Sequence, residues 1–492
     1  MELIRLTKVN EVYLHVDAEP WLRQELADYF TFMVPGYQFM PAYRNKMWDG
    51  KIRLLDMRNN IIYAGLLSHI EKFAQDRDYD IQYDSSVGIT NEFSLQEGKE
   101  FIETLDLPED IPIRDYQLNA FVHAVRKKRC LLLSPTASGK SLIIYALMRY
   151  YEGKKALIIV PTTSLVSQLY KDFSDYGVNA GWSSDNHVHY IMSGRDKHSD
   201  MPITISTWQS LYKMPQEYFE QYDVIVGDEC HQFKAKSLTS IMTKLVNAEY
   251  RFGTTGTLDD AQTHKLVLEG LFGRVKRVTT TKELIDKKQL AEFDIKAITL
   301  KYPEDVCKEI SKKKYHEEVD FLVSNNKRNA FIRNLAVSLE GNTLVLFQYV
   351  EKHGNLLHEI IKNKVAKGRK VFYVYGGTDT ELREQVRAIV ESEKDAIIVA
   401  SYGVYSTGVN IKNLHNIIFT HPGKSKIRVL QSIGRGLRTS KEKTKATLYD
   451  LVDDLSYKTH KNFAHKHFLE RYKYYRDEKF PVKIYKVNFN GI

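Results

Sequence analysis

The chain has 492 residues, 43% of them hydrophobic, and a formal net charge of +9. The length predicts about three domains, and three scattered cysteines exclude a disulfide framework or a zinc-binding cluster. Charges interrupt every apolar run near the start, so we expect no signal peptide, no membrane span and a soluble, cytoplasmic protein. The basic excess favours a polyanionic partner such as nucleic acid, although a solvated basic surface would give the same charge.

The first hundred residues differ from the rest of the chain because they are acidic overall. They lead into LDLPEDIPIRDYQ at 105–117, where prolines and acidic residues precede a helical pattern. This punctuation predicts a linker that closes a small α+β accessory domain over residues 1–107.

Within that domain, YRNKMWDGKIRLLD at 43–56 places Asp49-Gly50 between two alternating runs, which predicts a β-hairpin with a two-residue turn. In this register Met47 and Ile52 point towards a core. The same register places Lys46 opposite Arg53. Two like charges in these positions are unfavourable unless an anion lies between them, although acidic groups elsewhere in the domain could also neutralise them. The opposite face carries the candidate nucleic-acid contacts Arg44, Lys46, Trp48, Lys51 and Arg53, with the tryptophan available to stack on a base.

From residue 113 onward, short apolar runs alternate with helical patterns. This alternation predicts two successive α/β domains, over 113–292 and 293–454, each with a parallel sheet covered by helices. The expected strands of the first domain are 130–134, 156–160, 203–207, 223–227 and 251–255, and those of the second are 343–347, 370–375, 396–401, 416–421 and 445–453.

The segment SPTASGKS at 134–141 follows an apolar run and opens a helical pattern, which is the context of a phosphate-binding P-loop. Its leading glycine is replaced by serine, but the following proline also favours a tight turn. Backbone N–H groups at a helix N-terminus favour phosphate, the lysine adds a point charge, and the last hydroxyl can ligate Mg²⁺. The candidate ATP and Mg²⁺ ligands are therefore Thr136, Ser138, Gly139, Lys140 and Ser141.

A second acidic motif, DVIVGDECH at 223–231, places Asp228 and Glu229 directly after an apolar strand. A carboxylate at this edge of a parallel sheet can hold the Mg²⁺ shell, and its neighbour can take a proton from an attacking water. A lone Asp-Glu pair is commonly only an acidic turn. This pair, however, lies about ninety residues after a P-loop and within an α/β pattern, so an acidic turn alone is a weak explanation for it.

Together, SPTASGKS and DECH resemble motifs I and II of superfamily 2 helicases and translocases. The resemblance implies two tandem RecA-like domains that bind ATP and Mg²⁺. The remaining motifs follow in the family's order: PTTSLVSQ (161–168), ISTWQS (205–210), TGT (255–257), LVLFQYVEKHG (344–354), VYGGTDTELR (374–383), ASYGVYSTGVN (400–410) and QSIGRGLR (431–438).

The same resemblance assigns roles to further residues. Arg435 and Arg438 lie three apart, on one helical face, and would supply positive charge to the transferred phosphoryl group. Asn410 stands where the family often has an acidic residue, which puts the usual contact there in doubt. The other expected nucleotide contacts are Arg114, Gln117, His231 and Gln431, and the expected DNA phosphate contacts are Thr162, Thr207, Gln209 and Thr407.

The last segment, 455–492, is basic and interleaved with aromatic residues, which predicts a helical tail. Phe468, Leu469, Tyr472 and Tyr475 share one face of that helix. Such a face more often packs on a domain than on nucleic-acid bases.

The segment GYQFMPAYRNKMWDGKIRLLD ahead of the helicase motifs resembles that of phage recombination helicases. The resemblance implies a monomer acting on branched DNA (forks, Holliday junctions, R-loops) in recombination, repair and replication, in the host cytoplasm, alongside phage replication or single-strand-binding proteins. Three alternatives stay open: an RNA helicase, the motor subunit of a restriction complex, and a nucleotide-gated clamp. No nuclease motif of the PD…ExK type is evident, and a clamp needs no general base such as Glu229.

Overall fold

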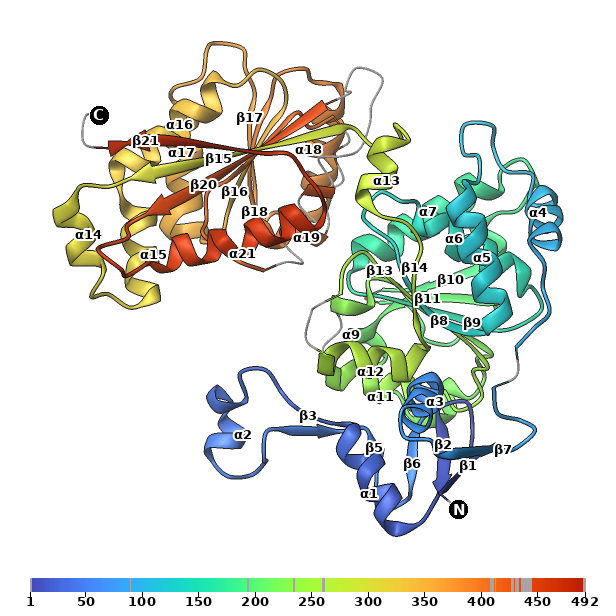
Figure 1. Cartoon of the computed structure of the whole chain (residues 1–492). Helices are drawn as coiled ribbons and strands as arrows, with labels where there is room; N and C mark the ends of the chain where they lie inside the picture. The colour runs from blue at the N-terminus through green and yellow to red at the C-terminus, as the bar shows by residue number, and fades with distance from the viewer. Residues whose placement is uncertain are drawn as a thin grey trace. The chain divides into compact units, whose positions relative to one another are not determined.

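The computed structural model describes residues 2–88, 90–192, 194–232, 235–258, 262–407, 411, 413–425, 429, 433–434 and 445–489. The chain forms two compact units (Figure 1). The first comprises residues 1–134 and 139–279, and the second comprises residues 135–138 and 280–492. In the described part of the chain, no helix is both long enough and apolar enough to cross a membrane.

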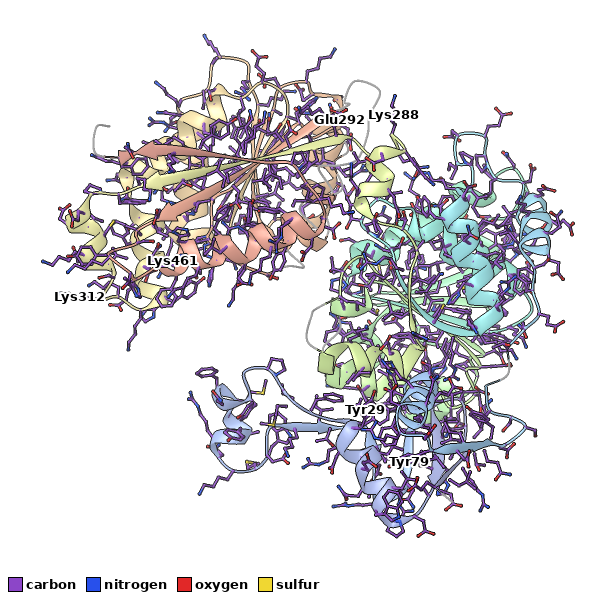
Figure 2. All side chains as sticks on the ribbon, viewed as in Figure 1. Tyr29, Tyr79, Lys288, Glu292, Lys312 and Lys461 are labelled. Carbon is purple, nitrogen blue, oxygen red and sulfur yellow. The ribbon has the colours of Figure 1, made fainter. Side chains whose placement is uncertain are left out.

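The amino-terminal domain is built on a five-stranded mixed sheet in the order β5-β6-β2-β1-β7. A cluster of aromatic rings joins α1 to α3: Phe73 packs against Tyr29 and Tyr79, and the Arg77 guanidinium lies 4.1 Å from the Phe73 ring centre (Figure 2). The elements are β1 (Leu3–Lys8), β2 (Tyr13–Asp17), α1 (Pro20–Tyr29), β5 (Leu55–Asp56), β6 (Ile61–Tyr63), the 3₁₀ turn η2 (Ala64–Leu66), α3 (Leu67–Gln75) and β7 (Asp80–Tyr83), followed by α4 (Leu95–Thr104).

The predicted two-residue hairpin at Asp49-Gly50 is wrong. The strand β4 (Lys51–Arg53) pairs with β3 (Thr31–Met33), and the amino-terminal loop, defined here as residues 34–50, connects them. The loop contains a 3₁₀ turn, η1 (Tyr37–Phe39), and a short helix, α2 (Pro41–Arg44).

Packing inside the loop explains the error. Proline at the start of α2 favours a helical turn where an extended strand was expected. Gly50 has a φ of +81° and lies under the Tyr37 ring, where a Cβ would approach that ring to 2.6 Å. Met47, expected to face a core, is instead 81% exposed.

The first α/β lobe has a seven-stranded, fully parallel sheet in the order β10-β11-β9-β12-β13-β8-β14. All five predicted strands are confirmed, and the strands that the sequence analysis missed, β10 and β14, are short and lie at the two edges. The strands are β8 (Arg129–Leu133), β9 (Ala156–Val160), β10 (Val188–Ile191), β11 (Ile203–Thr207), β12 (Val224–Gly227), β13 (Tyr250–Thr255) and β14 (Val275–Arg277).

Helices cover both faces of this sheet (Figure 1). One face packs against α5, α6 and α7. The other packs against α11 and α12, and its hydrophobic core continues without a break into the core of the amino-terminal domain. The helices are α5 (Asp115–Lys127), α6 (Lys140–Tyr150), α7 (Thr163–Gly177), α8 (Ser184–His187), α9 (Trp208–Leu211), α10 (Gln216–Phe219), α11 (Ala235–Met242) and α12 (Gln262–Phe272).

The second lobe has another seven-stranded parallel sheet, in the order β17-β18-β16-β19-β20-β15-β21. Its five predicted strands are confirmed as β16 (Thr343–Phe347), β17 (Val371–Val374), β18 (Ile397–Ser401), β19 (Asn416–Phe419) and β20 (Lys445–Asp454). The sheet also contains β15 (Glu292–Lys301), and the helices are α13 (Thr281–Asp286), α14 (Glu304–Ile310), α15 (Tyr315–Ser324), α16 (Asn326–Ser338), α17 (Asn355–Lys362), α18 (Thr380–Ser392) and α19 (Tyr402–Thr407).

The carboxyl-terminal segment is part of this lobe. A purely helical segment is predicted from the sequence, but the structure contains a strand as well as a helix. Helix α21 (Phe463–Asp477) packs on β20 with Phe468 and Tyr475 buried in the core, whereas Tyr472 of the predicted aromatic face is exposed. The segment then forms β21 (Val482–Asn488), a strand beside β15 at the sheet edge. Its lysines are exposed, as is typical of an edge strand that avoids pairing with another chain. Lys312 and Lys461 of the same lobe are also exposed (Figure 2).

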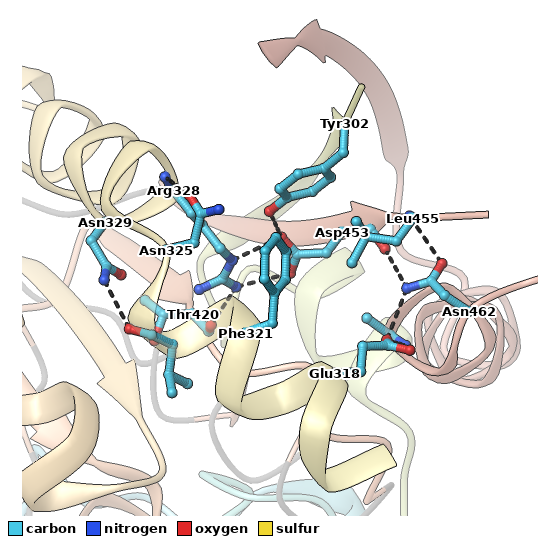
Figure 3. Close-up of polar contacts among 12 residues, drawn as sticks. Tyr302, Glu318, Phe321, Asn325, Arg328, Asn329, Thr420, Asp453, Leu455 and Asn462 are labelled. Carbon is cyan, nitrogen blue, oxygen red and sulfur yellow. Dashed lines mark hydrogen bonds and ion pairs between the residues drawn. The ribbon is translucent and has the colours of Figure 1, made fainter. Parts of the chain in front are cut away.

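A buried polar network fixes β20 against α16 and α21 (Figure 3). Arg328 donates to both carboxylate oxygens of Asp453, at 2.7 and 2.9 Å, and to the Thr420 carbonyl at 2.7 Å. The Tyr302 hydroxyl donates to the same carboxylate at 2.7 Å. Asn462 bridges the Asp453 carbonyl and the Glu318 carboxylate, at 3.0 and 2.9 Å.

The substitution Asp453→Asn would leave the Arg328 guanidinium buried without a counter-charge. Breaking one side of a buried pair costs about 3–5 kcal/mol. We expect much faster hydrogen exchange of the β20 amides, measured by mass spectrometry. The control is Asp320→Asn, which breaks the exposed ion pair with Lys352 and should leave β20 exchange unchanged. Equal exchange in both variants would contradict the stabilising role.

Candidate ATP and nucleic-acid sites

The candidate ATP site lies at the carboxyl edge of the first lobe's sheet. The loop after β8 carries the P-loop sequence, and the loops after β12 and β13 carry the acidic motif and the TGT motif. Ala137 and Gly139 have φ values of +66° and +76°. Such left-handed residues beside a helix start can turn successive N–H groups towards one anion.

The Lys140 ammonium makes an ion pair with Glu229, at 3.0 Å between Nζ and Oε1. The Gly256 N–H faces the other oxygen of that carboxylate at 3.4 Å, and the imidazole of His231 lies at the same distance from it. The backbone turns sharply after β12, where Glu229 has a φ of +47°. A positive φ is uncommon for a residue other than glycine. The structure therefore brings the predicted lysine and acidic residue into direct contact.

Asp228 is buried beside this pair. It accepts hydrogen bonds from the Thr254 hydroxyl and from the Glu229 N–H, the latter at 2.9 Å. Burial and the neighbouring charge of Glu229 raise the pKa of Asp228. Burial also disfavours ionisation of Glu229, but Lys140 and His231 outweigh it and hold the pKa of Glu229 below its usual range. The two carboxyls thus have pKa values shifted in opposite directions, a common feature of catalytic acid–base pairs.

Other predicted nucleotide contacts also lie at this edge. Gln117 is buried, and its amide donates to the Gly139 carbonyl at 3.2 Å while accepting from the Arg114 N–H at 2.8 Å. The Ser141 hydroxyl is hydrogen-bonded to the Tyr176 hydroxyl at 2.7 Å. Ser138 is fully buried.

The site offers few protein ligands for a metal. In the parts of the chain that the structure describes, no cluster of three or more His, Cys, Asp or Glu side chains could hold a metal ion. Mg²⁺ in nucleotide sites is commonly held by one or two protein oxygens, with phosphates and waters completing the shell. Ser141 and Asp228 fit that limited role.

Several predicted residues cannot be placed in the site. Gln431, Arg435, Arg438 and Asn410 lie outside the described residues, and Thr407 ends α19 with a side chain that is not described. Their assigned roles stay predictions.

Three predicted DNA contacts gather at the ends of the neighbouring strands β9 and β11. Thr162 caps α7, and its hydroxyl accepts from the Leu165 N–H at 3.4 Å. The Thr207 hydroxyl is 3.1 Å from the Ser210 hydroxyl, and the Gln209 amide donates to the Pro161 carbonyl at 3.4 Å. Hydroxyl and amide groups of the types that commonly contact phosphate therefore lie at adjacent strand ends, with Thr207 buried and Gln209 exposed.

The basic residues of the amino-terminal domain are arranged differently from the prediction. Arg53 makes an ion pair with Asp49, so no uncompensated charge of Arg53 faces Lys46. The Trp48 ring N–H donates to the Lys51 carbonyl at 2.9 Å. In the described part of the chain Arg44, Lys46 and Lys51 form no ion pair. A groove of about 620 Å³ in the amino-terminal loop is lined by Gln38, Tyr43, Arg44, Lys46, Met47, Trp48 and Asp49.

The sequence analysis missed two side chains of the ATP site. Thr254 holds Asp228 from the adjacent strand β13, and Tyr176 holds Ser141 from the end of α7. Thr254 directly precedes the TGT motif, so its place on a strand beside the acidic motif is a usable signal. Tyr176 has no such signal.

Comparison with known proteins agrees with this arrangement. The family described as "DNA helicase UvsW, N-terminal" matches residues 4–84, "Type III restriction enzyme, res subunit" matches 110–260, and "Helicase conserved C-terminal domain" matches 326–440. The ATP-dependent DNA helicase UvsW of Enterobacteria phage T4 is 37% identical, over 97% of this chain and 98% of its own length. The chain belongs to the UvsW family of DNA helicases.

Structural comparison supports the assignment to the UvsW family. The crystal structure of T4 UvsW covers 99% of this chain and all of its own, with a TM-score of 0.52 and 35% identity. A fragment of an HsdR subunit from Vibrio vulnificus covers 80% of this chain and 73% of its own, with a TM-score of 0.56 and 18% identity, which shows the fold alone. The two-lobed RecA-like fold class is thereby confirmed.

Proposed function

We propose that this UvsW-family chain is an ATP-dependent DNA helicase or translocase that acts on branched DNA. The buried contact between Lys140 and Glu229, with Asp228 beside it, is the observation that carries the proposal. A nucleotide-gated clamp has no need of a carboxylate held ionised next to the phosphate-binding lysine.

Glu229 is suited to act as the general base of hydrolysis. In this structure Lys140 stabilises its carboxylate, so the base is ionised but paired. Triphosphate binding would draw the ammonium towards the phosphate oxygens and leave the carboxylate free to accept a proton from water. Withdrawal of the Lys140 ammonium from the carboxylate would raise the pKa of Glu229 and make it a stronger base.

The other residues of the site orient the reactants. Backbone N–H groups around Ala137 and Gly139 would hold the phosphates, and Ser141 and Asp228 would hold Mg²⁺, which supplies positive charge to the phosphate oxygens when bound. Thr254 fixes the carboxylate of Asp228. The predicted contribution of Arg435 and Arg438 is positive charge that offsets the negative charge of the transferred phosphoryl group, and Gln431 is a predicted nucleotide contact.

Contacts to the DNA backbone would let the protein move along DNA of any base sequence. Thr162, Thr207 and Gln209 present polar groups at one sheet edge, and Thr407 is the predicted counterpart in the second lobe. Groups of this kind bind phosphate and do not read base edges, so we expect movement along DNA to be independent of sequence.

The amino-terminal loop is the proposed contact to the branch. It places Arg44 and Lys46, which make no ion pair with any described residue, beside exposed apolar side chains, with Phe39 73% exposed and Met47 81% exposed. Cations that follow a backbone and rings that stack on bases are the usual means of holding unpaired strands. The similarity to T4 UvsW accords with a role in phage recombination, repair and replication in the host cytoplasm. In that role the DNA substrates would be forks, Holliday junctions and R-loops. The partners would be replication or single-strand-binding proteins.

A restriction motor is less well supported. The restriction-subunit family matches only residues 110–260, which hold the nucleotide motifs common to these enzymes. The amino-terminal domain matches the UvsW family instead. RNA as substrate is an outcome that the following assay distinguishes.

The substitution Glu229→Gln should still allow DNA binding, should not weaken nucleotide binding, and should lower turnover by about a hundredfold or more, because general-base catalysis contributes about 10²–10⁴. The assay is steady-state ATP hydrolysis with forked DNA, linear duplex, single strands and RNA in parallel. The unaltered protein should respond most to the fork. Unchanged hydrolysis in the variant would remove Glu229 from the mechanism, and a stronger response to RNA would contradict the DNA assignment.

Replacing Arg44 and Lys46 by Ala should weaken fork binding and reduce its dependence on salt. Each lost phosphate contact lowers the slope of log K against log salt by about 0.9, so the double variant should lose about 2. Fluorescence anisotropy over a salt series measures this slope. The matched control, Arg58→Ala with Lys99→Ala, removes two exposed cations outside the amino-terminal loop and should keep the slope. Equal slopes in all three proteins would overturn the role of the loop.

A further inference from the structure

A second cavity of about 640 Å³ lies within the first unit, where the amino-terminal domain meets the first helicase lobe. We call it the junction cavity. Its walls come from η2 and α3 on one side and from the beginnings of β8 and β14 on the other. Strand β8 begins at Arg129 in this wall and ends at the P-loop, so the cavity is at the opposite edge of the sheet from the ATP site.

The rim of the junction cavity is positively charged. Lys127, Arg274 and Lys276 are exposed there and make no ion pair or side-chain hydrogen bond within the described part of the chain. The carboxylates of the wall are already engaged. Glu11 pairs with Lys8 and Arg129, Glu249 pairs with Lys128, and Glu71 accepts from the Tyr83 hydroxyl.

The walls also hold apolar surface and unsatisfied donors. Leu14, Leu67, Val87 and Val275 line the cavity and offer a surface for a flat ring. The Ser68 hydroxyl and one terminal guanidinium nitrogen of Arg129, both in the wall residues, are buried without a hydrogen-bond partner among the described residues.

His123, also in the wall, reports the local positive potential. Burial, then the charges of Lys276, Lys127 and Arg126, lower its pKa to about 4. The imidazole is therefore neutral at pH 7. An anion bound among these cations would offset their charge and raise the pKa of His123.

We propose that the junction cavity binds a nucleotide, with its phosphate on Lys127, Arg274 and Lys276 and its base on the apolar wall. The volume falls within the range of about 300–1,000 Å³ typical of small-molecule sites and is far larger than a lone phosphate needs. The ligand can be a free nucleotide or the terminal nucleotide of a DNA strand. The junction cavity is distinct from the proposed ATP hydrolysis site. If the cavity binds no nucleotide, the proposed function at the ATP site is unaffected.

The test is binding calorimetry with the full chain, in which any binding at the P-loop is common to the unaltered protein and to both double variants. The probes are deoxythymidine 5′-monophosphate, a 5′-phosphorylated oligodeoxynucleotide and inorganic phosphate. The double variant Lys127→Glu, Lys276→Glu should bind the first two at least tenfold more weakly. The matched control Arg58→Glu, Lys99→Glu carries the same charge change and should bind as the unaltered protein does.

Each outcome decides the proposal. Weakened binding of the mononucleotide assigns the site to free nucleotides, and weakened binding of the phosphorylated strand alone assigns it to a strand end. Equal binding by both variants, no binding to the unaltered protein, or inorganic phosphate binding as tightly as the nucleotide would overturn it. As a second measurement, the ring NMR signals of His123 in the unaltered protein should shift with whichever of the two probes the Lys127→Glu, Lys276→Glu variant binds more weakly, and a fixed signal at saturation with that probe would also overturn it.

Discussion

The ion pair between Lys140 and Glu229 is the interaction on which the functional account depends. It joins the helix that follows β8 to the loop that follows β12, two strands separated in the sheet only by β13. Because parallel strands end at one edge, the lysine proposed to bind phosphate and the glutamate proposed as the general base meet although they lie far apart in sequence. Asp228 is buried beside them, so that two carboxyl groups and one ammonium lie together at the sheet edge, an arrangement suited to binding and hydrolysing a nucleoside triphosphate.

Most of the fold was predictable because central parallel strands are buried on both faces and appear as continuous apolar runs. The runs at 156–160 and 203–207 are examples, and both are strands with every residue buried. Strands β10 and β14, of four and three residues, are too short for such a pattern. The terminal strand β21 was not predicted because it is an edge strand whose side chains are mostly exposed, so its pattern resembles that of a polar helix.

The site was predictable where short motifs set the chemistry and was not where distant residues complete it. The P-loop and the acidic motif identified Lys140 and Glu229, but the partners Thr254 and Tyr176 depend on tertiary contacts. The amino-terminal loop shows the limit most clearly. Asp49-Gly50 is a typical hairpin turn sequence, yet Tyr37 packs over Gly50 and Pro41 starts a helix, so the strand pairs with residues 31–33 instead.

Calorimetric titration of ATP without Mg²⁺ tests the central contact most directly. If Glu229 competes with phosphate for the Lys140 ammonium, then Glu229→Gln releases the lysine, and ATP should bind several-fold more tightly than to the unaltered protein. Lys140→Met should abolish this difference between glutamate and glutamine at position 229. Weaker or unchanged binding by the Glu229→Gln variant would contradict the account.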